Sequence, residues 1–200
     1  MPKQPRPEAV ALRIELLDVV PLVWRRVLVP NNWTLATLHH YLQWVMGWTD
    51  SHAHEFEIGA ALVAPDWWIA EVESEEEASR YRDERRVSVA AVAAELGPRG
   101  ECEYRYDMGD GWVHRIVIEP VRPSACSDAT RPICLAGENA CPPEDVGGPH
   151  AYGEFLRILA DRRHEQHDEL ARWVGGVFDP KGFDLNRINR DWKATKRRSG

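Results

Sequence analysis

The sequence predicts an α+β fold, with one mostly antiparallel sheet built from hairpins, a central helix, and further helices at the C-terminus. Three observations predict it. Hydrophobic residues alternate with period two in paired segments, one leucine-rich segment has a helical repeat, and the last quarter of the chain is helical in pattern. The order of these segments is compatible with a β-grasp-like roll.

The first hairpin is expected over residues 10–16 and 22–29, with a turn at Val20 and Pro21. A helix should follow it, because Thr34 is a typical N-cap and Gly47 a typical C-terminal stop. The helical repeat places four apolar residues on its buried face: Leu35, Leu38, Leu42 and Val45.

The middle of the chain predicts two more strands and a short helix. Alternation over residues 52–58 places His52 and His54 on one face of a strand, and residues 67–72 are a further strand candidate. Ser88 is a suitable N-cap for a helix that should end at Gly97 and Pro98.

A second hairpin is expected over residues 102–118, with residues 107–111 as its loop. Residues 120–149 are expected to form a long loop, which in a compact domain is usually functional or held by packing. Helical patterns over residues 152–174, broken near Arg162, and over residues 184–196 complete the chain.

Composition indicates one globular domain spanning residues 1–200, with 44% hydrophobic and 28% charged residues. Residues 1–9 are expected to be flexible and residues 193–200 to form a basic tail. No apolar window approaches the roughly 20 residues of a membrane span, and the start lacks a signal-peptide core, so we expect a cytoplasmic protein with no membrane partner. The net charge of −7 argues against extensive nucleic-acid binding.

Six segments, in order, carry a family pattern: PLVWRRVLVP (21–30), TLATLHHYLQWVMGW (34–48), SHAHEFEIG (51–59), YRYDMGDGWVHRIVIE (104–119), CLAGENACPPEDVGG (134–148) and FDPKGFDLNRIN (178–189). On these segments the chain resembles the plasmid pRiA4b ORF-3-like family. The resemblance implies a passenger protein of plasmids or mobile elements, with no settled activity. A resolvase role is not expected, because apart from Ser199 no serine lies near clustered arginines. Val146 stands where the family often has cysteine.

A histidine and aspartate cluster is the first candidate site. His52 and His54 have the spacing of half a metal site, and His114 and Asp110 come from the second hairpin. If the two regions are adjacent, these four side chains converge on a divalent metal, the one cofactor that the sequence suggests. The alternative is that the histidines are hydrogen-bonded core residues and that the loop aspartates bond backbone N–H groups.

Glu144 and Asp145 follow two prolines, which hold them on an extended segment. They are candidates for a general base or for metal binding. They could equally be structural, paired with Arg25 and Arg26 or placed near a helix N-terminus. We expect this segment to lie on the same side of the domain as the loop at residues 107–111.

A ligand cleft is the other candidate site. Five side chains of the first hairpin, the first helix and the second hairpin are its candidate lining: Trp24, Arg25, Arg26, Trp48 and Trp112. The alternative for the tryptophans is that they build the core.

The cysteines are expected to be free thiols. Cys134 and Cys141 lack the close spacing of a zinc knuckle, and Cys102 alternates with core tyrosines, so no structural zinc is predicted. Catalysis by Cys141 with His150 is a further alternative. Packing of Ile133 and Leu135 against the sheet should order the long loop instead.

No residue set matches a known catalytic motif, which favours a binding or accessory protein with a protein or small-molecule partner. The alternative is a metal-dependent hydrolase that uses the histidine and aspartate cluster as ligands and Glu144 or Asp145 as general base.

Overall fold

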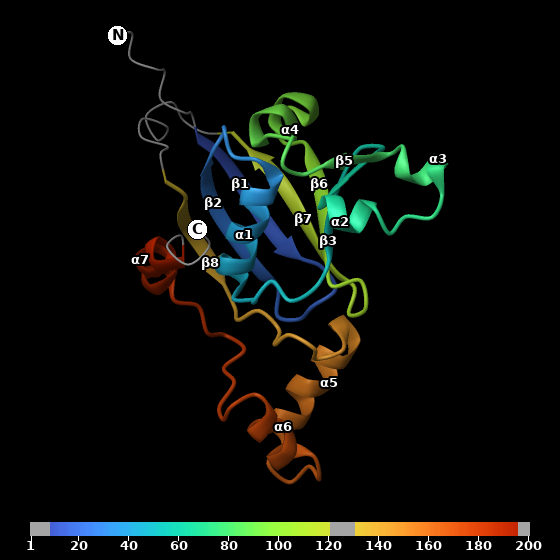
Figure 1. Cartoon of the computed structure of the whole chain (residues 1–200). Helices are drawn as coiled ribbons and strands as arrows, with labels where there is room; N and C mark the ends of the chain where they lie inside the picture. The colour runs from blue at the N-terminus through green and yellow to red at the C-terminus, as the bar shows by residue number, and fades with distance from the viewer. Residues whose placement is uncertain (1–8, 121–130, 196–200) are drawn as a thin grey trace.

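A mixed sheet is the centre of the computed structural model, which describes residues 9–120 and 131–195 (Figure 1). Within these residues eight strands lie in the order β5-β4-β3-β6-β7-β1-β2-β8, and only the pair β4–β5 is parallel. The strands are β1 (Ala9–Leu16), β2 (Val23–Pro30), β3 (His54–Ile58), β4 (Ala61–Ala64), β5 (Tyr81–Asp83), β6 (Glu101–Tyr106), β7 (Trp112–Glu119) and β8 (Ile133–Glu138). The predicted α+β class with a mostly antiparallel sheet is confirmed.

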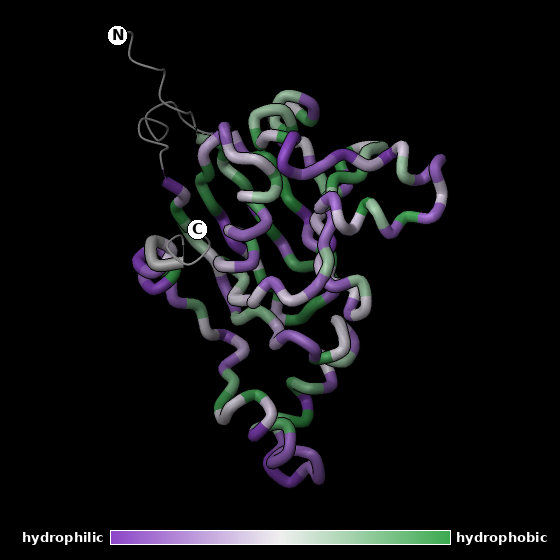
Figure 2. Tube along the Cα trace, viewed as in Figure 1, coloured by the Kyte–Doolittle hydropathy of each residue, from purple (hydrophilic) through white to green (hydrophobic). Residues whose placement is uncertain are grey.

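The helix α1 (Leu35–Met46) covers one face of this sheet, as Figure 1 shows. Thr34 caps it by accepting the backbone N–H of Thr37, and Gly47 ends it with a φ of 94° that favours glycine. The four apolar residues predicted for its buried face are at most 4% exposed. The core therefore lies between α1 and the sheet, where Figure 2 shows hydrophobic strand residues.

The predicted strand at residues 67–72 is wrong, because this segment begins with the short helix α2 (Asp66–Ile69). The strand that pairs with β3 is instead β4, which follows a tight turn at Gly59 with a φ of 58°. Pro65 ends that strand, and the preset φ of proline suits the start of a helix. Trp67 is 56% exposed as a result and does not belong to the core.

Two further helices follow in this half of the chain. The helix α3 (Glu75–Ala78) is capped by Ser74 in an exposed, acidic segment. The helix α4 (Val89–Leu96) has Ser88 as its N-cap and ends at Gly97, as predicted.

The long predicted loop contains the strand β8, which pairs with β2 at the edge of the sheet. Cys134 is 1% exposed, whereas Ile133 and Leu135 are 45% and 37% exposed. The expectation that Ile133 and Leu135 pack against the sheet is therefore wrong, because neighbouring residues of a strand point to opposite faces. Residues 121–130, with Cys126, lie outside the described residues.

Three helices complete the chain: α5 (Gly148–Ala160), α6 (His167–Trp173) and α7 (Leu185–Thr195). The break after Ala160 agrees with the predicted interruption near Arg162. The helices α5 and α6 project beyond one end of the sheet, while α7 lies beside β8 (Figure 1). The Asn189 side chain fastens α7 there, since it exchanges two hydrogen bonds of 2.8 Å with the backbone of Cys134. None of the described helices is long and apolar enough to cross a membrane.

Candidate metal centre

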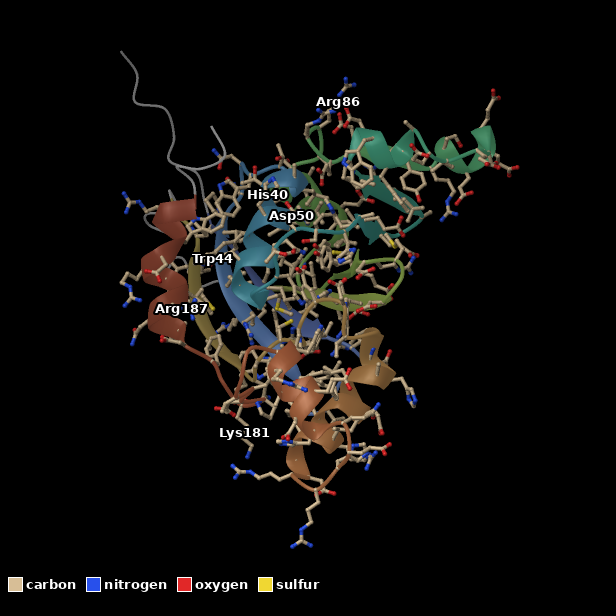
Figure 3. All side chains as sticks on the ribbon, turned by 60° about the horizontal axis from the view of Figure 1, so that its bottom comes forward. His40, Trp44, Asp50, Arg86, Lys181 and Arg187 are labelled. Carbon is tan, nitrogen blue, oxygen red and sulfur yellow. The ribbon has the colours of Figure 1, made fainter. Side chains whose placement is uncertain are left out.

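A cleft of about 390 Å³ opens where the chain passes from α1 to β3. Four histidines, two carboxylates and an exposed tryptophan are among its lining residues: His39, His40, Asp50, His52, His54, Trp67 and Glu84. The side chains of His40 and Asp50 are labelled in Figure 3, where they lie next to each other at the surface. This concentration of titratable groups makes the cleft the candidate site.

Two buried imidazole rings are stacked at the base of the cleft. The rings of His39, from α1, and His54, from β3, have centroids 3.4 Å apart and are inclined by 2°. The two residues are 1% and 4% exposed. Two rings held face to face at this distance cannot both carry a positive charge without strong repulsion, so at least one is neutral.

Each stacked ring presents its Nε2 atom to a carboxylate. The distance from His39 Nε2 to Asp50 Oδ1 is 2.6 Å, and that from His54 Nε2 to Glu84 Oε2 is 2.7 Å. His40 Nδ1 lies 3.1 Å from the other Asp50 oxygen. One ligand atom each from His39, Asp50 and His54 lies within 4.8 Å of the others, so the three are within reach of a shared cation if one of the parallel rings rotates.

Buried polar groups behind the site hold its geometry. Tyr104 Oη lies 2.8 Å from His39 Nδ1 and accepts a hydrogen bond of 2.9 Å from Gln43 Nε2. Gln43 Oε1 in turn accepts the backbone N–H of Asp50 at 3.0 Å. Asp50 is thereby fixed at a φ of 60°, in the left-handed region. A histidine ligand is commonly oriented by a partner at its second ring nitrogen, as His39 is here.

The pKa shifts in this cluster favour a neutral ring beside an ionised carboxylate. Burial lowers the pKa of His39 to about 4, and the hydrogen bond with Asp50 only partly opposes this effect. Burial also acts to raise the pKa of Asp50, but hydrogen bonds with His39 and His40 hold it well below the usual range. A neutral imidazole and an ionised carboxylate are the states that bind metal ions.

A second group of possible ligands lies near the first. His52 Nε2 is 3.0 Å from Asp145 Oδ1 and 3.5 Å from Asp107 Oδ2. Asp107 is 7% exposed, and its Oδ1 accepts the backbone N–H groups of Gly109 and Asp110. This group links the segment before β3, the β6–β7 loop and the segment before α5.

Comparison with known proteins gives the family of the chain. The family model described as plasmid pRiA4b ORF-3-like protein matches residues 8–187. The chain belongs to this family. A relative from Sinorhizobium fredii (strain NBRC 101917 / NGR234), the uncharacterized protein y4hQ, is 38% identical over 185 residues, which are 90% of this chain and 89% of the relative.

The crystal structure of a protein of unknown function, MM3350 from Methanosarcina mazei Go1, has a similar fold. The two share 29% identity with a TM-score of 0.75, over 92% of this chain and 99% of the other. The predicted membership of the pRiA4b ORF-3-like family is confirmed. The names of these relatives specify no catalytic role.

The four ligands predicted from the sequence do not form one set in this family member. His54 belongs to the His39 group and His52 to the Asp107 group. His114 is fully buried with its Nδ1 atom 3.1 Å from Tyr104 O, and burial lowers its pKa to about 3. Asp110 accepts the backbone N–H of Gly147. The set is divided because His52 precedes β3, and its ring faces Asp107 and Asp145 instead of lying beside His54.

The predicted side of the Glu144 segment is confirmed, whereas its predicted arginine partners are wrong. Asp110 Oδ2 accepts the backbone N–H of Gly147 at 3.1 Å, so the β6–β7 loop and this segment adjoin. Glu144 accepts hydrogen bonds from Thr49 and from Tyr106 Oη, and Asp145 faces His52.

The two arginines have other partners. Arg25 donates to four backbone carbonyl oxygens, and Arg26 pairs with Glu119 at 2.5 Å. The two point to opposite faces of β2, which explains why only one is exposed.

The predicted aromatic lining does not form one cleft. Trp48 and Trp112 are 7% and 1% exposed and pack together in the core, with ring centroids 5.9 Å apart. Trp24 instead packs under the guanidinium of Arg13, 4.3 Å from its ring centroid. Of the five candidates, Arg25 and Trp48 share a pocket, which lies beside α7 and apart from the histidine cleft.

The thiols have the chemistry of buried cysteines. Burial raises the pKa of Cys102 to about 12 and that of Cys134 to about 11, and it also raises the pKa of Cys141. A protonated thiol is a poor nucleophile and a poor metal ligand. Among the described residues, neither group of possible ligands includes a cysteine.

The sequence interpretation missed His39, His40, Asp50 and Glu84. One signal for His39 was present, since it follows Leu35 by four residues and therefore lies on the buried face of the predicted helix. A histidine at a buried position needs a polar partner. Its partners could not be identified, because Asp50 and Tyr104 reach it only through the tertiary fold.

Proposed function

We propose that the protein binds a divalent transition-metal ion through His39 Nε2, His54 Nε2 and Asp50, and uses this ion to bind a small ligand in the cleft. The observation that carries the proposal is the buried, stacked pair of imidazoles whose Nε2 atoms both face carboxylates. Imidazole with carboxylate suits zinc, iron, nickel or copper.

A hydrogen-bonded core network is the competing explanation of the same residues. Two features favour a metal centre. The His39 ring is neutral at pH 7 beside an ionised Asp50. A cation can therefore bind without a charged imidazole first releasing a proton to solution. The group also lines a surface cleft, which a network that only stabilises the core does not need.

The geometry allows an open coordination sphere. Ligand atoms bound to one zinc ion at about 2.1 Å lie within about 4.2 Å of each other, and the 4.8 Å group is close to this limit. Because the two rings are parallel and imidazole binds a metal in its ring plane, a shared ion requires one ring to rotate out of the stack. Metal binding at His39 Nε2 places the ring proton on Nδ1, where Tyr104 Oη can accept it. Three protein ligands leave at least one position for a ligand from the cleft.

Glu84 favours a second candidate function, metal-dependent hydrolysis. Its carboxylate is 8% exposed and lies 2.7 Å from His54 Nε2, so it would serve as the general base if the proposed ion activates a water molecule in the cleft. Glu144 and Asp145, which were the candidate bases of the alternative hydrolase hypothesis, are bonded to groups outside the stacked pair.

Zinc titration of the metal-free protein tests the proposed metal centre. We expect one ion to bind and the melting temperature to rise, and we expect His54→Ala to abolish both effects. His150→Ala is the matched control, because His150 is exposed on α5 and belongs to neither ligand group. Zinc binding that survives His54→Ala in a folded variant, or no binding to the wild type, refutes the proposal.

Tyr104→Phe should weaken zinc binding by about 10- to 100-fold while leaving one ion bound per chain. The hydroxyl orients His39, and its loss also leaves Gln43 Nε2 without an acceptor. Tyr81→Phe is the control, since that hydroxyl bonds Glu55 away from the ligands. Equal zinc affinities for the two variants, measured by calorimetry, would contradict the role given to Tyr104.

A further inference from the structure

A second pocket, of about 420 Å³, lies between the C-terminal end of α1 and the segment that leads into α7. Its lining combines two arginines with aromatic side chains and includes Arg25, Trp44, Trp48, Phe183, Asp184 and Arg187. Figure 3 labels Trp44 and Arg187, which project beside each other from α1 and α7. The hydrogen bond of 3.0 Å from Trp44 Nε1 to Ile188 O holds the two helices together here.

Among the described residues, Arg25 is a buried cation without a counter-ion. It is 3% exposed, and no carboxylate oxygen of the described residues lies within 4.0 Å of its guanidinium. Its Nε and Nη groups donate to the carbonyls of Val45, Trp24, Glu138 and Asn139 at 2.8 to 2.9 Å. One of the five N–H groups of its guanidinium therefore has no acceptor in the described part of the chain.

Carbonyl dipoles reduce the cost of burying this charge but do not neutralise it. Buried charges in proteins are normally paired with an opposite charge. Phe183 covers one face of the guanidinium, with its ring centroid 4.6 Å from Cζ, so solvent is kept from that side. An anion in the adjoining pocket would supply the missing charge.

Arg187 provides a second positive charge in the same pocket. Its side chain is exposed and forms no ion pair with the described residues. Asp191, on the same helix, pairs with Arg190 instead. Asp184 also lines the pocket, but its Oδ1 accepts the backbone N–H of Arg187 and so caps α7. The planar fork of a free guanidinium matches a carboxylate.

We propose that this pocket binds a small organic acid, with its carboxylate between Arg25 and Arg187 and its apolar body against Trp44 and Phe183. The volume of about 420 Å³ is within the range of small-molecule sites. This site is separate from the histidine cleft and does not require a bound metal.

Calorimetry with sodium benzoate at constant ionic strength tests the proposal, on protein treated with chelator. Benzoate should bind with one site per chain, and uncharged benzamide should not bind. Arg187→Gln should weaken benzoate binding about tenfold. Lys181→Gln should change it less than twofold, because this exposed lysine removes an equal charge from the same segment but does not line the pocket.

Three results would overturn the inference. They are the absence of saturable benzoate binding at millimolar concentrations, equal binding of benzamide, and unchanged binding to Arg187→Gln. Phenyl phosphate that binds where benzoate does not would refute the carboxylate assignment. His54→Ala should bind benzoate as the wild type does, which separates this site from the metal centre.

Discussion

Arg25→Ala should lower the free energy of unfolding by about 3–4 kcal/mol, measured by urea denaturation. The side chain joins three parts of the fold, because its donors reach carbonyls of β2, the C-terminal turn of α1, and the end of β8 with the residue after it. The substitution leaves four carbonyl groups without a donor and removes the contact with Phe183. Water that enters the adjoining pocket will satisfy some of these groups, which keeps the expected loss below the sum of four lost hydrogen bonds.

Arg26→Ala is the matched control, with an expected loss of less than about 1 kcal/mol. Arg26 is the next residue of β2, but it points to solvent and makes one exposed ion pair, with Glu119. Arg25→Lys should also destabilise the protein, since an ammonium group cannot reach the same carbonyls with a planar fork. Equal stabilities of the Arg25 and Arg26 variants would show that the carbonyl contacts contribute little.

Local sequence patterns were sufficient to predict much of the fold. The hairpin of β1 and β2 has uninterrupted pairing from Ala9 with Pro30 to Leu16 with Val23, as its period-two alternation predicted. The bounds of α1 followed from Thr34 and Gly47, because a cap and a left-handed glycine act on the backbone within one turn. Such signals depend on neighbours in sequence and are therefore readable from it.

Pairing between strands that are distant in sequence could not be predicted from local patterns in the same way. The strand β8 has few alternating hydrophobic residues, and it exists because β2 offers a free edge and because Asn189 bonds the Cys134 backbone. The register of β8 decides which of its side chains are buried. In the observed register Ile133 and Leu135 point outward, whereas a shift by one residue would turn them to the opposite face. Nothing local to residues 133–138 specifies that register.

The candidate site depends even more on tertiary structure. Spacing drew attention to His52 and His54, but their nearest partners come from α1, the residue after β5, the β6–β7 loop and the segment before α5. A pair of histidines two residues apart on a strand was expected to share one ligand set. The structure divides them, since only His54 is in β3 and stacks on His39.

The start of α5 is joined to the β6–β7 loop by a close approach of the two backbones, and Gly148 is the residue that allows it. A Cβ atom on Gly148 would lie 2.3 Å from the backbone oxygen of Asp110 in the β6–β7 loop, and the φ of Gly148 is +81°. The neighbouring Gly147 N–H donates to Asp110 Oδ2 at 3.1 Å. No flexible side chain can move aside to relieve that contact, because the obstructing atom belongs to the backbone.

Gly148→Ala should therefore lower the free energy of unfolding by roughly 3 kcal/mol, from the left-handed strain and the displacement of α5 from the β6–β7 loop. Amide hydrogen exchange should rise first in α5, and the contact of His52 with Asp145 should loosen with it. Gly153→Ala, within the same helix, is the control. A Cβ there meets no atom within 4 Å, so this variant should be stabilised by about 0.5–1 kcal/mol. If Gly148→Ala matched it in both stability and exchange, α5 would not be held by this backbone contact.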